Sequence, residues 1–369
     1  MICKAIWLAL AGTLLAACSG HGGAGAGSAR KVLNLYIWSD YLAPDTLSNF
    51  EKRTGIKVNV AYFDTNETLE TKLLAGSSGF DVVVPTSAYF ARQIKAGVYL
   101  RLDKSRLPNL VNLDPQIMRR VQEFDPGNAH GVVYMWGTDG IGYNAKMVHS
   151  LMPDAPVDSW RLLFDPNVAA KLAKCGISVL DTPADTVRAV LSYLGRDPNS
   201  QSDADLQAAA AVLAKVRPYI RNINSSEYIQ ALANGDLCVA LGYNGDVMQA
   251  RDRAREAGNG IDVRYVVPKE GSVLWFDMLA IPKDAPHPDS AYAFINYMMD
   301  PKVIAEVSNY KRYANANAAA TPLVHPDVKS DPGIYPTPAQ IKGLSVQLAD
   351  TPEHTRALTR MWETFKTGR

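Results

Sequence analysis

The sequence predicts an α/β fold built from two domains, and three observations carry this prediction. Strand-like and helical segments alternate from residue 32 onward, which is typical of βαβ units with a parallel sheet. A strand-like segment over residues 132–143 contains several glycines, which mark a bend or a close backbone approach and indicate a crossing between two lobes. The length of 369 residues is too great for one small core.

The overall composition is ordinary for a globular protein. Apolar residues make up 47% and charged residues 20% of the chain, so nothing indicates disorder. The net charge of +1 lacks the basic character expected of a nucleic-acid-binding protein. Any selectivity for charged ligands must therefore arise locally.

The amino-terminal residues carry the pattern of an export signal. Lys4 precedes an apolar run over residues 6–15, and two alanines stand directly before Cys18. We therefore expect residues 1–17 to be a signal peptide. The cysteine after small residues resembles the lipobox of bacterial lipoproteins, which would place the protein in the periplasm with a lipid on Cys18; an ordinary signal peptide with a stray cysteine is the alternative. Residues 18–30 are rich in Gly, Ala and Ser, as in a flexible tether.

Cys175 and Cys238 remain after the leader is set aside. An exported protein meets an oxidising compartment, so we expect these two residues to form a disulfide. The two cysteines lie 63 positions apart, and closing a loop of this length stabilises a fold by roughly 4 kcal/mol on the chain-entropy model. Two separately buried thiols are the alternative.

The first part of the chain predicts strands and helices in turn. Leu33, Leu35 and Ile37 alternate with polar positions, as in a strand with one buried face. Continuous apolar character over residues 80–84 indicates a central strand of a parallel sheet. The predicted elements are a strand over 32–38, a helix over 44–53, a strand over 56–62, a helix from an N-cap at Asn66 to Gly76, and a strand over 80–84.

A second α/β unit is expected to begin near residues 158–163. Beyond residue 301, prolines separate two or three further helices. Between these two regions we expect strands over 176–180, 237–241, 263–267 and 273–281. The helices expected there lie over 184–194, 203–216, 227–234 and 290–299, and a further helix follows the strand over 237–241 and ends at residue 255.

Acidic and aromatic side chains gather where the predicted strands end. In an open α/β sheet, ligands bind outside the carboxyl ends of the strands. Carboxylates pair with ammonium groups, and aromatic faces attract cations and cover methylenes, so this composition suits a ligand with positive ends and an apolar middle. The alternative is structural: Asp40 caps a helix and Trp38 is core. The gathered residues are Trp38, Ser39, Asp40, Tyr41, Thr86, Asp181, Asp185, Tyr243, Asp246, Trp275, Asp277 and Tyr313.

Several ordered motifs resemble the putrescine- and spermidine-binding proteins of bacterial ABC importers. The resemblance runs from about residue 32 to residue 369. The motifs are Trp38-Ser39-Asp40-Tyr41, Phe80-Asp81-Val82-Val83-Val84-Pro85, Tyr134-Met135-Trp136-Gly137-Thr138, Asn234-Gly235-Asp236-Leu237-Cys238, Gly245-Asp246, Pro268-Lys269-Glu270-Gly271 and Tyr313-Ala314-Asn315-Ala316-Asn317.

The resemblance implies a type II periplasmic binding protein, with two lobes that close over a ligand. Each lobe would be a mostly parallel sheet flanked by helices, and crossing strands would join the lobes. Residues 31–137 with 260–318 would form the first lobe, and residues 138–259 with 319–369 the second. The implied protein is a monomer that binds a polyamine and passes it to ABC permease subunits. It binds no nucleic acid, needs no cofactor and meets the membrane only through its lipid anchor.

The resemblance also implies which residues hold the ligand. One ammonium group would lie between Asp246 and Asp277, the other near Ser39 and Asp40, with aromatic faces around the methylenes. The paired cysteines match family members that carry a disulfide. The implied ligand-binding positions are Trp38, Ser39, Asp40 and Tyr41 in the first lobe, Asp185, Tyr243 and Asp246 in the second, and Trp275, Asp277 and Tyr313 near the crossing strands; Thr86 joins them as a strand-end hydroxyl.

Two departures from the family pattern concern the choice of polyamine. Tyr243 stands where the family usually has Trp, so one wall of the sandwich is smaller and gains a hydroxyl. Trp275 stands where putrescine-preferring members tend to have Phe and spermidine-preferring members Trp. The whole motif set favours putrescine, and spermidine is the alternative.

Two other functions are compatible with parts of the pattern. Two Asp residues facing one cleft could act as acid and base in glycoside hydrolysis, although a cationic ligand instead requires ionised carboxylates. Tyr41, Tyr243 and Tyr313 could be imagined as ligands of ferric iron, but adjacent paired tyrosines are missing. The six histidines show no metal-binding spacing, and we expect no enzyme activity and no metal site.

Overall fold

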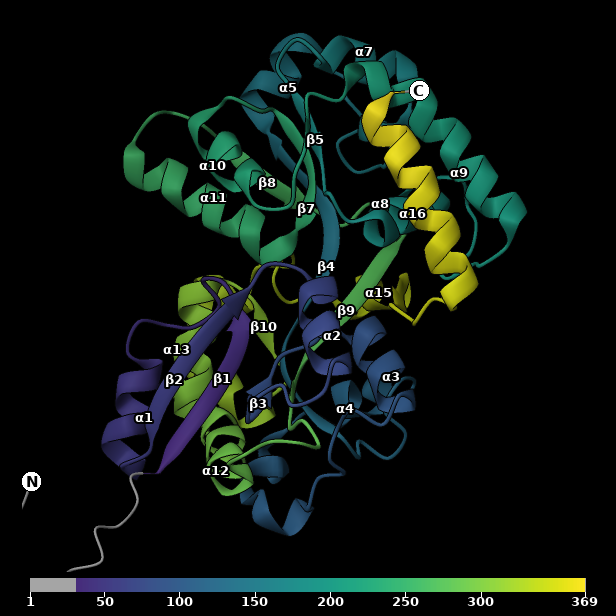
Figure 1. The fold of residues 1–369 in the computed structure, drawn as a ribbon. Coiled ribbons are helices and arrows are strands. Elements are labelled where there is room, and N and C mark those ends of the chain that lie inside the picture. The colour runs from purple at the N-terminus through teal and green to yellow at the C-terminus, as the bar shows by residue number, and fades with distance from the viewer. Residues whose placement is uncertain (1–30, 369) are drawn as a thin grey trace, which may run out of the picture. The chain divides into compact units, whose positions relative to one another are not determined.

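The computed structural model describes residues 31–368, which form an α/β fold with two hydrophobic cores (Figure 1). The first core is built mainly from residues 33–136 and 273–346, and the second mainly from residues 141–263 and 358–365. The predicted two-lobed α/β fold is confirmed. The predicted signal peptide, lipidated Cys18 and tether lie outside the described residues.

The first sheet begins with three parallel strands. β1 (Val32–Trp38) lies between β2 (Lys57–Phe63) and β3 (Val82–Val83), and it buries Leu33, Leu35 and Ile37 completely. Because these strands run the same way, the residues that follow β1 and β3 lie at one edge of the sheet. The helices of this part are α1 (Thr46–Thr54), α2 (Asn66–Leu74), α3 (Ser87–Lys95), η1 (Lys104–Arg106), η2 (Pro108–Asn112) and α4 (Pro115–Val121).

Two long strands cross between the cores. β4 (Gly131–Asn144) is buried along all 14 residues, and β9 (Ser272–Ala280) along all nine. The two strands pair antiparallel over residues 131–138 and 274–280, and β4 then continues into the second sheet against β7 (Val239–Tyr243) and β8 (Val263–Val266). Figure 1 shows both strands passing between the lower and upper halves of the view, in opposite directions. The predicted crossing strands are therefore present.

The second sheet repeats the mixed pattern. β5 (Ile177–Val179) lies parallel between β7 and β6 (Asn222–Ile223). Both sheets are mixed rather than mostly parallel, because β4 is antiparallel to the strands that it pairs with in each sheet and β9 is antiparallel to β3. Cys175 and Cys238 form the predicted disulfide, with Cα atoms 5.4 Å apart. The helices here are α5 (Ala145–Leu151), α6 (Arg161–Phe164), α7 (Pro166–Leu172), α8 (Pro183–Tyr193), α9 (Asp203–Val216), η3 (Arg217–Tyr219), α10 (Glu227–Asn234) and α11 (Asn244–Ala257).

The last hundred residues contribute to both cores. The sequence division placed residues 319–369 with the second lobe, whereas Ala320, Val328 and Val346 pack in the first core. Leu358, Trp362 and Phe365 of the final helix pack in the second core, where that helix lies beside α8 and α9 (Figure 1). The elements are α12 (Pro288–Met298), α13 (Pro301–Lys311), β10 (Ala314–Asn315), η4 (Ala318–Leu323), α14 (Pro326–Lys329), α15 (Pro338–Lys342), β11 (Leu344–Val346) and α16 (Pro352–Thr367).

Local details differ from the sequence predictions in several places. Thr65, not Asn66, caps α2, since its hydroxyl accepts a hydrogen bond from the Thr68 amide. β3 has two residues instead of the five predicted, because Asp81 lies in a bend and the pairing has ended by Val84 and Pro85. β10 and β11 were not predicted, since such short strands exist only through pairing with β4 and β9. Among residues 31–368, no helix combines the length and apolar character needed to cross a membrane.

Candidate functional site

The carboxyl group of Asp277 lies at the centre of the candidate site. Asp277 belongs to β9 and is only 5% exposed. The Tyr41 hydroxyl donates to Oδ2 at 2.8 Å, and the Thr86 hydroxyl donates to Oδ1 at 2.6 Å. Burial raises the pKa of Asp277 to about 7, although both hydrogen bonds act to lower it. Three segments far apart in the sequence thus converge on one carboxyl with neutral donors around it.

Asp246, in the first turn of α11, forms a second carboxyl position. The hydroxyls of Tyr228 and Tyr313 donate to its two oxygens at 2.9 Å and 2.7 Å. Burial raises the pKa of Asp246, and the two hydrogen bonds oppose this shift. Tyr313 packs in the first core and Tyr228 in the second, so this carboxyl joins the two cores.

Asp185, in the first turn of α8, forms a third carboxyl position. The Tyr243 hydroxyl donates to Oδ2 at 2.9 Å, and the Gln347 amide donates to Oδ1 at 2.5 Å. Burial raises the pKa of Asp185, while the Arg188 guanidinium lowers it. The three carboxyl positions therefore share one design, in which neutral hydroxyl or amide donors contact a buried acid.

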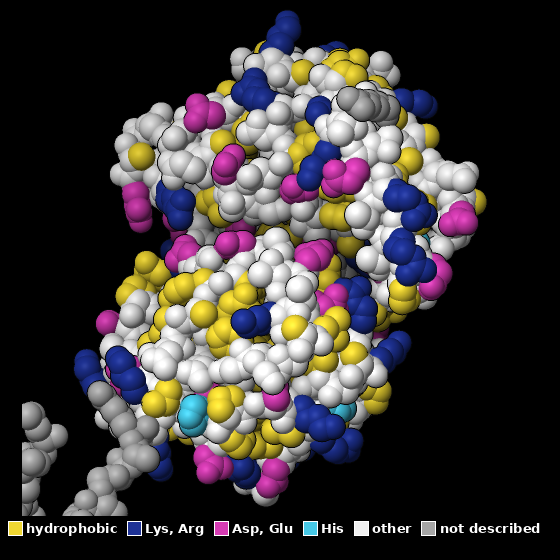
Figure 2. Space-filling view, in the orientation of Figure 1, with side chains coloured by type: hydrophobic (Ala, Val, Ile, Leu, Met, Phe, Trp, Pro, Cys, Tyr) yellow, Lys and Arg dark blue, Asp and Glu magenta, His cyan; other side chains and the backbone are white. Residues whose placement is uncertain are grey.

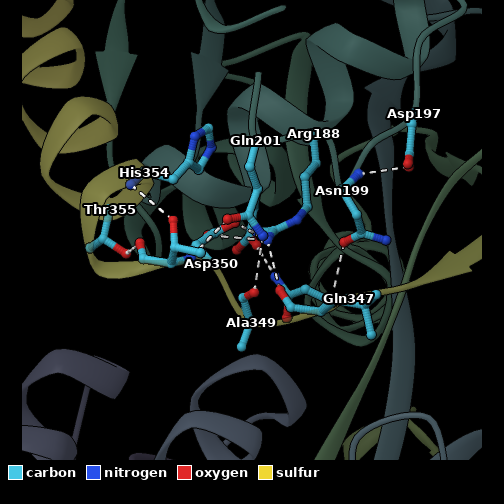
Figure 3. Close-up of polar contacts among 12 residues, drawn as sticks. Arg188, Asp197, Asn199, Gln201, Gln347, Ala349, Asp350, His354 and Thr355 are labelled. Carbon is cyan, nitrogen blue, oxygen red and sulfur yellow. Dashed lines mark hydrogen bonds and ion pairs between the residues drawn. The ribbon is translucent and has the colours of Figure 1, made fainter. Parts of the chain in front are cut away.

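A network of polar contacts holds the segment after β11 that carries Gln347. Asn199 donates to the Val346 carbonyl at 2.9 Å and accepts from the Leu348 amide at 3.1 Å. Arg188 donates to the Leu348 carbonyl at 2.9 Å and to both Asp350 oxygens at 3.0 and 3.1 Å. Figure 3 shows these side chains converging on the segment between β11 and α16. Gln347 is thereby positioned for Asp185.

A chain of aromatic rings connects the three carboxyl positions. Tyr41 meets Tyr313 edge to face at 5.6 Å between ring centroids, Tyr313 meets Trp275 at 5.4 Å, and Trp275 meets Tyr243 at 6.0 Å. Three of the four rings carry a hydroxyl that donates to one of the acids. Tyr41 donates to Asp277, Tyr313 to Asp246 and Tyr243 to Asp185. The arrangement offers apolar faces between anionic groups.

Two glycines allow these rings to approach the backbone. A Cβ atom at Gly137 of β4 would lie 2.5 Å from the indole ring of Trp275. A Cβ atom at Gly245 of α11 would lie 2.5 Å from the ring of Tyr313. Any larger residue would displace a ring of the site, so glycine is required here for close approach.

The cluster after β1 is only partly directed towards these carboxyls. Trp38 is half-buried, donates its indole N–H to the Val84 carbonyl at 2.8 Å and packs against Phe63. Ser39 and Asp40 are exposed, and the buried Lys311 ammonium lies 2.5 Å from Asp40 Oδ1. The helix-cap alternative for Asp40 is wrong, because α1 begins after Asp45. The charge of Asp40 is largely balanced by Lys311.

One gathered residue lies elsewhere, and several contributors were missed. Asp181 accepts from the Trp362 indole at 2.7 Å and from the Lys366 ammonium at 3.2 Å, so it anchors α16. Asp139, a buried acid in β4, was not among the predicted site residues, because residues 132–143 were interpreted only as a crossing between the lobes. The missed residues are Tyr134, Asp139, Tyr228, Lys311 and Gln347.

Tyrosine protonation and surface charge fit this arrangement. Burial and nearby acids, Asp277, Asp185 and Asp246 respectively, raise the pKa values of Tyr41, Tyr243 and Tyr313 far above the usual range, so each phenol keeps the proton that it donates. A tyrosinate metal ligand would need the opposite shift. Figure 2 shows acidic side chains along the furrow where the upper and lower halves of this face meet.

Comparisons with known proteins identify the relatives of this chain. Residues 46–337 match the bacterial extracellular solute-binding protein family. The chain is 51% identical over 341 residues to the putrescine-binding periplasmic protein SpuD of Pseudomonas aeruginosa, covering 92% of this chain and 93% of SpuD. It is 50% identical over 343 residues to the putrescine-binding periplasmic protein PotF of Escherichia coli, covering 92% of each. The solved structure of the spermidine/putrescine substrate-binding protein PotD of Streptococcus pneumoniae superposes with a TM-score of 0.77 at 29% identity, covering 92% of this chain and 99% of that one.

Proposed function

Because the chain belongs to the bacterial extracellular solute-binding protein family, we propose that it binds a protonated polyamine and delivers it to an ABC importer. One observation carries the proposal. Aromatic rings connect Asp185, Asp246 and Asp277, and the hydrogen bonds that these acids accept within residues 31–368 come from uncharged groups. Carboxylates without a bonded cation are suited to ammonium ligands. Putrescine is the first candidate, since SpuD and PotF are named for it, and spermidine is the second.

Each group of the site has a role in the proposed binding. The carboxylates of Asp246 and Asp277 accept hydrogen bonds from one ammonium group. The faces of Trp275 and Tyr313 cover the methylenes, and the hydroxyls of Tyr41 and Thr86 orient Asp277. Because the contributing residues come from both cores, a ligand that touches all of them favours the closed arrangement.

The raised pKa of Asp277 is a property of the site without a cation. Burial removes water from the carboxyl, and within residues 31–368 it accepts hydrogen bonds from the neutral hydroxyls of Tyr41 and Thr86 and from no cation. A bound ammonium group would restore the ionised form, so binding near neutral pH should release a proton. A glycosidase acid would instead stay protonated until it reacts with substrate. We propose that the protein binds its ligand without transforming it.

The setting of the protein follows from the same proposal. We propose export to the periplasm, attachment through a lipid on Cys18, a monomeric state and recognition by permease subunits when the ligand is bound. Residues 18–30 would then act as the tether between lipid and fold. Uptake of radiolabelled putrescine by cells with and without the gene, and mass spectrometry of the mature amino terminus, test these statements.

Titration calorimetry of the purified protein tests the ligand class. Putrescine, cadaverine, spermidine and spermine are titrated in turn, with butylamine as a singly charged control. We expect tight binding of at least putrescine or spermidine and much weaker binding of butylamine. Butylamine has one ammonium group, so some of the carboxylates of the site would remain without a cationic partner. Equal binding of butylamine and the polyamines, release of sugar from glycosides, or a coloured complex with ferric salt would contradict the proposal.

A further inference from the structure

Asp139, in the middle of β4, is a buried acid without a hydrogen-bonding partner for its side chain. It is 1% exposed, and within residues 31–368 neither carboxyl oxygen accepts a hydrogen bond. The indole N–H of Trp275 is likewise buried and unpartnered in the described part of the chain. Buried polar groups are nearly always satisfied, and leaving one unpaired destabilises the fold. The Trp275 indole lies close enough to Asp139 to lower the pKa of that carboxyl, although no hydrogen bond of ordinary geometry joins them. Asp139 is therefore a buried acid whose neighbouring donor is neutral, as at Asp185, Asp246 and Asp277.

The register of the second sheet places Asp139 beside the ring chain. Asp139 lies directly opposite Tyr243 in the β4–β7 ladder, so both side chains point to the same face. The Tyr243 hydroxyl donates to Asp185, and burial and then the Asp185 charge raise the pKa of Asp139. Asp139 and Asp185 therefore face the same small region next to Trp275.

Arg188, the cation whose charge acts on both acids, forms its hydrogen bonds with other groups. Arg188 lowers the pKa values of both acids through its charge. These hydrogen bonds go to Asp350, which lies beside Arg188 in Figure 3, and to the Leu348 carbonyl. The oxygens of Asp139 thus remain available to a ligand.

Resting on the polyamine-binding function proposed above, we propose that Asp139 is an additional ligand-binding carboxylate that determines specificity. Together with Asp185 it holds a cationic group at the Tyr243 end of the ring chain, away from Asp277. A diamine places one ammonium group between Asp246 and Asp277, and its other ammonium group does not extend as far as Asp139. A triamine has a third ammonium group that reaches the Asp139 end. The site therefore recognises triamines through a residue that a short diamine does not use.

Calorimetry with Asp139→Asn, which keeps the side-chain shape and removes the charge, tests this inference. We expect spermidine affinity to fall by at least about tenfold and putrescine affinity to change by less than about threefold. Asp181→Asn is the matched control, because Asp181 bonds Trp362 and Lys366 away from the site. That variant should leave both affinities unchanged.

Thermal unfolding of the ligand-free variants supplies a second readout. Removing an unpartnered buried carboxyl should raise the midpoint temperature of Asp139→Asn, whereas a structural role for Asp139 predicts a lower one. If Asp139→Asn does not fold, Asp139→Thr, whose branched side chain suits a strand, serves in its place. An unchanged ratio of spermidine to putrescine affinity overturns the inference alone. Failure of the unmodified protein to bind either amine overturns the proposed function.

Discussion

Replacing Asp277 with Asn should strongly weaken polyamine binding. The substitution keeps the size of the side chain but removes the charge that an ammonium group would meet. Asp277 is 5% exposed, and the rise of its pKa from 3.8 to about 7 corresponds to roughly 4 kcal/mol of cost for ionising it in the empty site. Truncating one partner of a buried charge pair costs about 2 to 5 kcal/mol. Because the amide avoids part of the ionisation cost, we expect a loss of about 2 to 4 kcal/mol, or roughly 30- to 1000-fold in affinity.

The assay is titration calorimetry with putrescine at about pH 8, where most of the Asp277 carboxyl is ionised. Asp181→Asn again removes a carboxylate outside the site and should bind as the unmodified protein does. A thermal melt of ligand-free Asp277→Asn verifies that the variant is folded, since one of its two hydroxyl donors loses an acceptor. Affinity within about threefold of the unmodified protein would refute the assignment of Asp277 to the ligand.

Four further outcomes are expected. Tyr243→Phe should weaken polyamine binding by roughly 3- to 10-fold in calorimetry, because Asp185 loses one neutral hydrogen bond; unchanged affinity would separate Asp185 from the ligand. Putrescine affinity should fall as the pH is lowered from about 8 to about 6, by up to about tenfold per unit, because protonated Asp277 must lose its proton on binding; Asp277→Asn should flatten that dependence. The same raised pKa predicts that the Asp277 contribution to the stability of the ligand-free fold is present at low pH and lost as the pH rises through about 7. Replacing both Cys175 and Cys238 with Ser should lower the unfolding free energy in urea by roughly 4 kcal/mol and leave putrescine affinity intact; a larger loss of affinity than of stability would connect the disulfide to the site.

The fold could be predicted where the sequence pattern is local. Leu33, Leu35 and Ile37 alternate because one face of β1 packs on the core, so the strand was predicted with its observed bounds. The helices α9 and α10 were also predicted at their observed bounds. β10 and β11 could not be predicted, because two or three residues become a strand only when β4 and β9 lie beside them.

The candidate site was predictable as a set of residue types at strand ends, but not as a set of partners. Tyr41 and Asp277 are 236 positions apart, so only the folded chain shows that the hydroxyl donates to the carboxyl. Lys311 lies in a helix and gave no reason to expect an ion pair with Asp40. Asp139 was missed because glycines drew attention to the bend in its strand, whereas its significance lies in its burial without a partner.

A crystal structure of the protein grown with putrescine tests the central claim most directly. The account predicts one elongated ligand with an ammonium nitrogen within hydrogen-bonding distance of Asp246 or Asp277 and with its methylenes against Trp275 and Tyr313. Putrescine bound away from all of these side chains, under conditions where calorimetry detects a single site, would contradict it.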